Sequence, residues 1–161
     1  AQVEQRQGLE ERVAIPLHDV LDELIQAQAA RVERADVRVE NQVAVGLQLL
    51  GERFLLRQAL NNLLDNALDF TPPGGVLRWS ARGEGEQLWV CLFNSGPAIP
   101  DYALPRLTER FYSLPRPNTG RKSTGLGLNF VQEVASLHGG ALQVSNVPGG
   151  VEVCLRLPAV G

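Results

Sequence analysis

Two asparagines in the stretch "LNNLLDNALDF" (60–70) are the first candidates for chemistry. Asn62 and Asn66 stand four residues apart, and in a helix this spacing puts their side chains on one face. Apolar residues recur at helical spacing on another face of the same stretch, so both amides lie close to a core. An Asn carbonyl oxygen is a hard ligand that could help to hold Mg²⁺, an ion usually bound together with phosphates and water. A pair of amides that hydrogen-bond to neighbouring backbone is the alternative that spacing alone leaves open.

Two glycine-containing stretches could contact a nucleotide. "NSGPAIP" (94–100) follows an expected strand, where a polar side chain could bond the edge of a base while Gly96 lets the ring approach. "STGLGL" (123–128) runs into a helix N-terminus, whose free N–H groups and positive dipole end suit phosphate. Arg121 and Lys122 precede it and could meet phosphate charge. A plain turn and a Gly-rich hinge remain the alternatives for the two stretches.

The hydrophobic pattern predicts the elements that would position these residues. Amphipathic helices are expected over 17–31 and 53–70 and within the stretch 124–140, where the helix opens behind two glycines and closes on Gly139 and Gly140, with a shorter helical segment near 103–110. Strand-like alternation is expected over 36–43 and in two hairpins, 76–93 and 141–158. Strands and helices are mixed without the strict alternation of a parallel sheet. We therefore expect an α+β fold, a two-layer α/β sandwich with helices on one face of a mixed sheet.

Composition limits the possible functions. The 161 residues are 44% hydrophobic and 20% charged, which is typical of one soluble globular domain. A net charge of −3 with scattered Lys and Arg excludes a basic stripe, so no nucleic-acid partner is expected. No stretch approaches the roughly 18 apolar residues of a membrane span, so we do not expect this piece to insert into a membrane.

The cysteines and histidines receive no catalytic role. Cys91 and Cys154 lie in strand-like runs and are expected as buried, reduced thiols of a cytosolic protein, with a disulfide as the less favoured alternative. His138 precedes Gly139 at a helix end, where a cation suits the dipole, and is expected to be structural. His18 lies near a helix start without a neighbouring catalytic pattern.

The order of these motifs resembles the ATP-binding catalytic domain of sensor histidine kinases, in the superfamily shared with DNA gyrase, over roughly residues 16–158. The matching boxes are "NNLLDNALDFTP" (61–72), "NSGPAIP" (94–100), "ERFY" (109–112), "STGLGL" (123–128) and "PGG" (148–150). The stretch 99–140 is similar to the CreC-type sensor kinases. The resemblance implies a Bergerat-type ATP-binding fold with a long, flexible ATP lid.

The resemblance also implies the site residues and the cofactors, ATP and Mg²⁺. Asn66 would be the metal ligand, and Asn62 and Asn66 the catalytic residues. Phe111 would anchor the lid, and Gly125 and Gly127 would wrap the phosphates. The full set of expected ATP-binding residues is Asn62, Asn66, Asp69, Phe70, Asn94, Gly96, Ala98, Ile99, Phe111, Tyr112, Arg121, Lys122, Ser123, Thr124, Gly125, Leu126, Gly127 and Leu128.

Three positions depart from the family pattern. Asn94 stands where Asp usually binds the adenine amino group, and its amide oxygen still accepts that bond. Ala98 replaces a usual Gly. Asp69 occupies a place often held by Lys or Arg, which puts a negative charge near the triphosphate unless Arg121 or Lys122 compensates. These departures motivate the alternative of a degenerate nucleotide-sensing or interaction module.

The implied reaction is phosphoryl transfer, which requires positioning and charge neutralisation more than covalent chemistry from the protein. The domain would offer the γ-phosphate of ATP to a histidine on a separate dimerisation domain of a homodimeric kinase, for relay to a cognate response regulator. Residues 1–15 would be the end of the dimerisation helix and a linker, and 16–161 the catalytic domain. The piece would be cytoplasmic, in a parent anchored in the bacterial inner membrane. The ATPases of the superfamily have at this position a Glu that acts as the base toward water. This chain has Asn62 there, which cannot take a proton, so hydrolysis is disfavoured.

Overall fold

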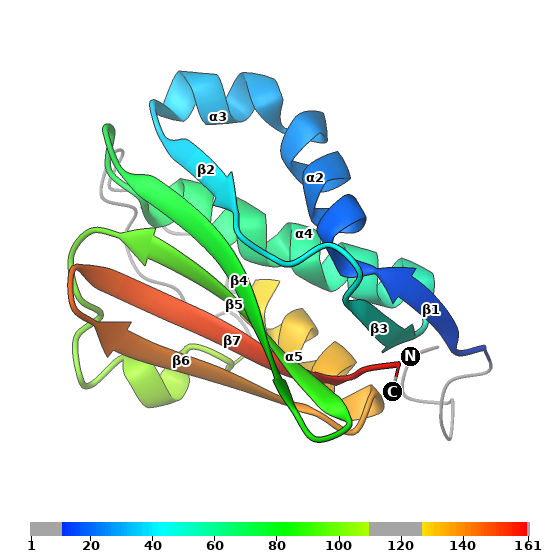
Figure 1. The fold of residues 1–161 in the computed structure, drawn as a ribbon. Coiled ribbons are helices and arrows are strands. Elements are labelled where there is room, and N and C mark those ends of the chain that lie inside the picture. The colour runs from blue at the N-terminus through cyan, green and yellow to red at the C-terminus, as the bar shows by residue number, and fades with distance from the viewer. Residues whose placement is uncertain (1–10, 110–126, 161) are drawn as a thin grey trace.

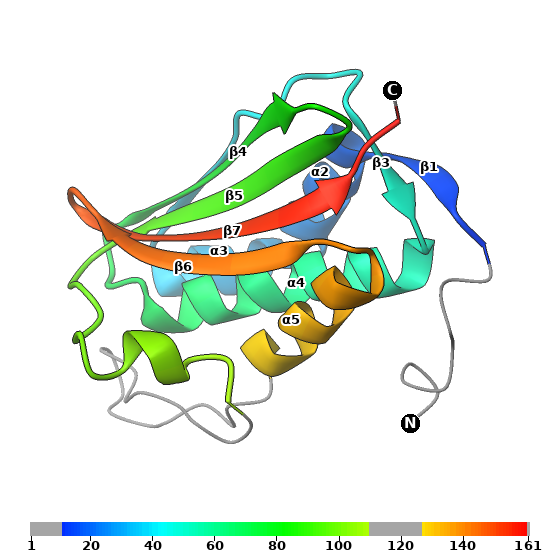
Figure 2. The same ribbon diagram turned by 90° about the horizontal axis from the view of Figure 1, so that it is seen from below.

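The computed structural model describes residues 11–109 and 127–160 as a sheet layer against a helix layer (Figure 1). The five-stranded sheet has the order β2-β4-β5-β7-β6, with β2 parallel to β4 and the other pairs antiparallel. Its strands are β2 (Arg38–Asn41), β4 (Val76–Glu84), β5 (Gln87–Ser95), β6 (Ala141–Val147) and β7 (Gly150–Pro158). Figure 2 shows the helices on one side of this sheet, which confirms the predicted two-layer arrangement.

The helices follow the predicted pattern, except that the first is interrupted and the short helical segment expected near 103–110 is a three-residue 3₁₀ turn among the described residues. They are α2 (Leu17–Ala27), α3 (Ala29–Ala35), α4 (Arg53–Phe70) and α5 (Gly127–Leu137), with a single 3₁₀ turn η1 (Leu104–Arg106). Helix α4 has the predicted bounds. The predicted helix over 17–31 is interrupted at Gln28, whose backbone leaves the helical region. Its side chain then reaches across to α4, so the break serves a contact between helices.

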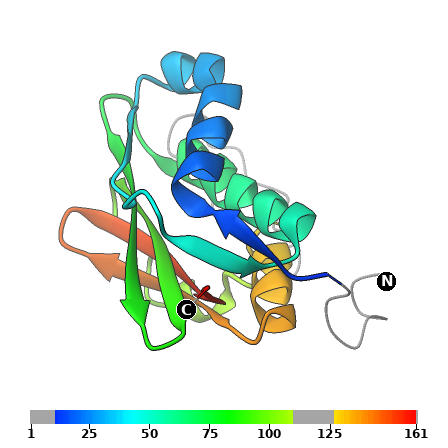
Figure 3. The same cartoon turned by 45° about the vertical axis from the view of Figure 1, so that its right-hand side comes forward.

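A second, two-stranded sheet lies beside the first and was not predicted. Strand β1 (Val13–Pro16) pairs with the antiparallel β3 (Gln48–Gly51), and they are the blue and teal arrows of Figure 3. A bridge between Leu49 and Ala159 joins this small sheet to the end of the chain. The runs "VAIP" of β1 and "QLLG" of β3 do not alternate apolar and polar residues, which is why the sequence did not reveal these strands. The predicted domain start, residue 16, is the last residue of β1.

The core lies between the inner face of the sheet and helix α4. The apolar side chains of α4 at the predicted helical spacing are all buried: Leu56, Leu60, Leu63, Leu64 and Ala67. Trp79 of β4 is fully buried in the same cluster. Burying one such leucine contributes about 1.5–3 kcal/mol to folding. This one-sided burial orients the polar face of α4 away from the sheet.

The two cysteines form a disulfide, so the expectation of reduced thiols is wrong. Cys91 and Cys154 are direct partners in the antiparallel β5–β7 register, with Cα atoms 4.1 Å apart. They belong to a small cluster with Trp89 that is separate from the main core. The guanidinium carbons of Arg82 and Arg156 lie 5.6 and 5.8 Å from the centre of the Trp89 ring. The two sulfurs meet because of the register between β5 and β7, and the spacing of the two cysteines along the sequence does not reveal this pairing.

His138 joins the end of α5 to the start of α4. The side chain is buried, Nδ1 lies 2.7 Å from the Val134 carbonyl oxygen, and Nε2 accepts a bond from the Glu52 N–H at 3.1 Å. An acceptor at Nε2 requires the neutral ring with its proton on Nδ1. Burial lowers the pKa of His138, although the bond to Val134 acts in the opposite direction. The expected structural role is therefore met by a neutral ring and not by a cation at the helix dipole.

Folding stability should consequently depend on pH through His138. The folded state disfavours protonation, so the unfolded chain binds the proton first as the pH falls below about 6.5. We expect the free energy of unfolding, measured by urea denaturation, to be greatest above neutral pH and to fall between pH 7 and pH 5. In His138→Gln this part of the pH dependence should be absent, and the lost hydrogen bonds should cost about 1–3 kcal/mol at pH 8.

Gln132→Ala is the control, because it changes an exposed residue of α5 that carries no titratable group. This variant should keep the pH dependence of the wild type. An unchanged pH dependence in His138→Gln would contradict the assignment of the neutral ring.

Candidate functional site

Helix α4 forms one side of the candidate site, and local contacts fix both of its ends. Glu52 is its N-cap, and the side chain accepts bonds from the N–H groups of Phe54 and Leu55 at 3.2 and 2.9 Å. At the other end the hydroxyl of Thr71 donates to the Ala67 carbonyl oxygen at 2.6 Å. Pro72 then prevents continuation of the helix. The polar face of α4 is thus held at a fixed position along the sheet.

The Asn66 amide lies directly against the first residue of α5. A Cβ atom on Gly127 would stand 2.8 Å from Nδ2 and 3.2 Å from Oδ1 of Asn66. A Cβ at 2.8 Å would force the Asn66 amide or the start of α5 to shift, so glycine lets the two lie this close without such a shift. Two sequence motifs, the asparagine helix and the second glycine of "STGLGL", therefore meet at one place.

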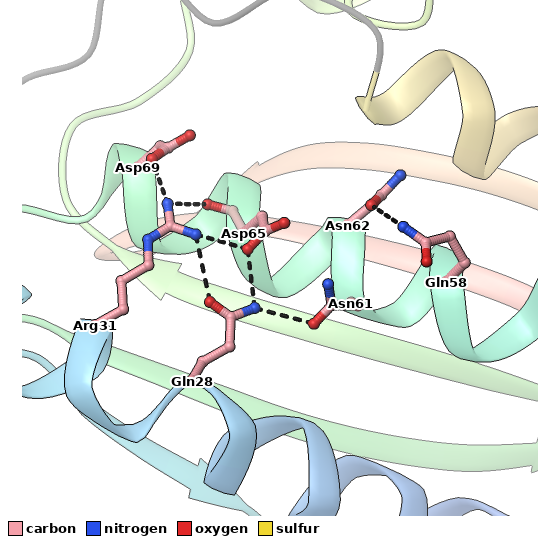
Figure 4. A network of polar contacts seen from close by, with 7 residues as sticks. All are labelled: Gln28, Arg31, Gln58, Asn61, Asn62, Asp65 and Asp69. Atoms are coloured by element: carbon pink, nitrogen blue, oxygen red, sulfur yellow. Dashed lines mark hydrogen bonds and ion pairs between the residues drawn. The ribbon is translucent and has the colours of Figure 1, made fainter.

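Neither asparagine is engaged by backbone in the described part of the chain. Asn62 accepts a bond from the Gln58 side chain at 3.2 Å, and Asn66 makes no hydrogen bond to any described residue. Figure 4 shows Asn62 pointing away from Gln28 and Arg31, towards the side on which α5 lies. Among the described residues, neither amide bonds to neighbouring backbone as the structural alternative had required.

The segment after β5 approaches the end of α4. Asn94 is largely buried and occupies the same face of β5 as Val90 and Leu92, which is the face covered by helices. Its side chain makes no hydrogen bond within the described residues. Gly96 has a φ of +139°, and a Cβ there would lie 3.0 Å from Pro72 Cδ, so the first glycine box packs on the residues that end α4.

The third glycine turn completes this corner of the site. The Gly96 N–H donates to the Gly149 carbonyl oxygen at 3.1 Å. Gly150 approaches Asn94 so closely that a Cβ there would stand 2.0 Å from its carbonyl oxygen. Any side chain at position 150 would collide with the backbone of β5, so this close approach of β5 to the turn between β6 and β7 requires glycine there.

Asn146 of β6 holds the segment that carries Ala98 and Ile99, and sequence reasoning missed it. Its Oδ1 accepts from the Ile99 N–H at 2.8 Å and its Nδ2 donates to the Ile99 carbonyl oxygen at 2.9 Å. Ala98 itself is exposed. Nothing in the sequence marks one Asn of an edge strand as the partner of a loop 47 residues away.

Asp69 lies in the last turn of α4 and is paired with a cation from α3. Arg31 Nη2 bonds to Asp69 Oδ1, and Arg31 Nη1 bonds to Asp65 Oδ1 at 2.6 Å (Figure 4). Gln28 donates to Asn61 Oδ1 at 2.9 Å and to Asp65 Oδ1 at 2.8 Å in the same network. The sequence did not indicate this contact, because 38 residues separate Arg31 from Asp69.

The remaining predicted residues divide into two groups. Phe70 ends α4 and is partly buried, and Leu128 of α5 packs on the core. The rest lie outside the described residues, and their roles stay predictions: Phe111, Tyr112, Arg121, Lys122, Ser123, Thr124, Gly125 and Leu126.

A family described as histidine kinase-, DNA gyrase B- and HSP90-like ATPases matches residues 51–161, more than half of the chain. The chain belongs to this family. The chain therefore contains the ATP-binding domain of this family, and the predicted motifs lie on α4, α5 and the glycine turns within it. Among the described residues, no helix has the length and apolar character needed to cross a membrane.

Sensor histidine kinases are among the relatives in this family. The sensor protein CreC of Escherichia coli K12 is 47% identical over 133 residues, covering 81% of this chain and 28% of CreC. The sensor-like histidine kinase SenX3 of Mycobacterium bovis is 30% identical over 148 residues, covering 91% of this chain and 36% of SenX3. This chain therefore spans about a third of the length of such proteins. The likeness confirms the resemblance to CreC-type sensor kinases.

Solved structures show the same fold. The catalytic domain of histidine kinase ThkA has a TM-score of 0.81 and 23% identity, with 92% of this chain and 97% of that domain covered. The described elements therefore have the arrangement of a histidine kinase catalytic domain, which also confirms the predicted fold class.

The close approach at Gly127 gives a test of the site. Gly127→Ala would place a methyl group against the Asn66 amide, so the start of α5 or the amide must move. We expect nucleotide affinity, measured with a fluorescent ATP analogue, to fall about tenfold. The free energy of unfolding should change by less than about 1 kcal/mol, because Ala is the better helix former.

Gly83→Ala is the matched control, since a Cβ at Gly83 of β4 meets no atom within 4 Å. It should leave nucleotide affinity unchanged. Equal affinities for the wild type and Gly127→Ala would show that the Asn66–Gly127 contact is irrelevant to the ligand.

Proposed function

We propose that the chain binds Mg·ATP at the site formed by the polar face of α4, the start of α5 and the segment after β5. The observation that carries this proposal is the Asn66 amide, which faces Gly127 and has no hydrogen-bond partner among the described residues. A side-chain amide oxygen fits Mg²⁺, which takes few protein ligands and completes its shell with phosphate and water. Bound Mg²⁺ would supply neutralisation of the phosphate charge.

The residues of the chain have separate tasks in this proposal. Asn66 would hold the metal through Oδ1, and Asn62 lies one helical turn earlier on the same face. Free N–H groups at the start of α5 would bind phosphate oxygens. The amide oxygen of Asn94 would accept a bond from the adenine amino group, and Gly96 would leave room for the ring. The site residues outside the described ranges keep the roles given by the family resemblance.

We further propose that the parent protein is a sensor histidine kinase. The γ-phosphoryl group would leave ADP and bond to an imidazole nitrogen on a separate dimerisation domain of the homodimer, for relay to a cognate response regulator. The relatives CreC and SenX3 support this, and so does a similar structure (TM-score 0.77) that is a complex of histidine kinase ThkA with the response regulator protein TrrA. The domain would work on the cytoplasmic side of a membrane-anchored parent.

Hydrolysis is not the proposed main reaction. Asn62 lies on the ligand side of α4, one turn before Asn66, and an amide cannot take a proton from water. The site can position a triphosphate, but this position offers no base that would activate water. Transfer to an external acceptor fits this arrangement.

Nucleotide binding should depend on magnesium and on Asn66. A fluorescent ATP analogue should bind saturably with Mg²⁺ and more weakly without it. Asn66→Ala should weaken the Mg²⁺-dependent binding by about 30-fold, which corresponds to on the order of 2 kcal/mol. Gln132→Ala, an exposed amide on the same helix as Gly127, is the control and should bind as the wild type does. Absence of saturable binding at millimolar nucleotide would favour the interaction-module alternative.

Phosphoryl transfer needs an added acceptor. When this chain is mixed with labelled ATP and a purified dimerisation domain from its own parent, acid-labile phosphate should appear on the histidine of that domain. Asn66→Ala should abolish the label. Nucleotide binding without any labelled histidine would defeat the kinase proposal while leaving the ATP site intact.

A further inference from the structure

The end of α4 that carries Asn66 has an unfavourable charge for a triphosphate. Asp65 and Asp69 stand four residues apart, which is a repulsive spacing for like charges on a helix. They also lie in the last two turns, where the helix dipole is negative, and the last turn holds no basic residue. Asp69 is three residues after Asn66, so its carboxylate stands beside the proposed metal ligand. Without compensation this helix end would repel the phosphates that Asn66 is meant to receive.

One guanidinium from the neighbouring helix spans both carboxylates. Arg31 of α3 contacts Asp65 through Nη1 and Asp69 through Nη2, and Nη2 also donates to the Asp65 carbonyl oxygen at 3.3 Å. The Asp69 side chain is only 16% exposed, whereas that of Asp65 is 40% exposed. The ion pair to Asp69 is therefore the one less screened by water.

Gln28 fixes the direction of this contact. It accepts from Arg31 Nη1 at 3.3 Å and donates to Asp65, so the guanidinium is held from two sides (Figure 4). The planar donor fork of an arginine suits two acceptors on successive turns, which a lysine ammonium matches less well. The break between α2 and α3 at Gln28 is what brings both side chains onto α4.

We propose that Arg31 is a positioning residue for the nucleotide site: it binds Asp65 and Asp69 from behind α4, offsets one of their two negative charges and thereby lets the Asn66 end of the helix accept a triphosphate. Arg31 acts through the carboxylates and does not touch the ligand. This inference rests on the proposed ATP function. It identifies Arg31 as a described cation that compensates Asp69. Arg121 and Lys122, which the sequence suggests for this role, lie outside the described residues and stay predictions.

An electrostatic role predicts a dependence on ligand charge and on salt. The effect of losing Arg31 should be greatest for ATP, smaller for ADP and least for AMP, because the repulsion grows with phosphate charge. It should also shrink as salt rises, since the Debye length falls from about 10 Å at 0.1 M to about 3 Å at 1 M. A residue that only supports the fold would weaken all three nucleotides equally.

The first experiment measures affinity for Mg·ATP, Mg·ADP and AMP in Arg31→Gln by calorimetry. We expect about tenfold weaker ATP binding at 50 mM salt, about twofold at 1 M salt, and less than about a twofold change for AMP. Arg31→Lys should restore part of the ATP affinity. Arg57→Gln is the matched control: Arg57 also links α4 to the preceding helices, through Glu23 of α2 at 2.7 Å, but lies nine residues before Asn66. It should bind all three ligands as the wild type does.

The second experiment removes the charge that Arg31 is proposed to neutralise. Asp69→Asn combined with Arg31→Gln should regain most of the lost ATP affinity. In an Asp65→Asn, Asp69→Asn background, Arg31→Gln should change ATP affinity by less than about twofold, because the guanidinium then has no ion-pair partner to hold it at the helix end and its charge is screened by water. This comparison also decides the question if Arg31→Gln alone does not fold.

The outcomes separate the two proposals. If the wild type fails to bind Mg·ATP, the proposed function itself is wrong. If the wild type binds but Arg31→Gln binds ATP equally well, or loses ATP and AMP to the same extent, the positioning role is wrong. A failure of Asp69→Asn to rescue, or a loss of affinity in the background without carboxylates, would likewise overturn it.

Discussion

The structure depends on how closely α5 is packed on α4. At its first residue, Gly127 lies against the Asn66 amide, and just past its last turn, His138 accepts a bond from the N–H of Glu52, the N-cap of α4. The two helices are therefore antiparallel and in contact at both ends. Each contact needs a particular residue: one without a side chain at Gly127 and a neutral ring at His138. The same helix pair therefore carries the candidate site at the end of α4 and the buried His138 at the start of α4.

The sequence was sufficient for the elements that repeat a pattern over many residues. Helix α4 was predicted with its observed bounds because its apolar spacing is regular and proline follows its end. The two hairpins were predicted because turn residues separate strand-like runs. The small β1–β3 sheet was missed, since neither of its strands alternates apolar and polar residues. The disulfide was missed because only the β5–β7 register brings Cys91 and Cys154 together.

The candidate site shows the same division between local and distant information. Asn66, Asn94 and the glycines were identified from short motifs whose residues are adjacent in sequence. Arg31 and Asn146 were not, because each acts on a partner 38 or 47 residues away through a contact that only the folded chain creates. Both contact a residue of the predicted site: Arg31 pairs with Asp69, and Asn146 bonds to the backbone of Ile99. Contacts between residues so far apart in the sequence depend on tertiary packing, and no local sequence pattern indicates them.

The Cys91–Cys154 bond makes a covalent ring of the chain between β5 and β7, with a sequence separation of 63 residues. Asn94, Gly96, α5 and the β6–β7 turn all belong to this ring. A loop of that length loses conformational freedom in the unfolded chain equivalent to about 4 kcal/mol in the chain-entropy account. The segment with Asn94, Gly96 and α5 is thereby tethered to the central strands even when its weaker contacts open, whereas α4, outside the ring, is retained by packing, hydrogen bonds and ion pairs.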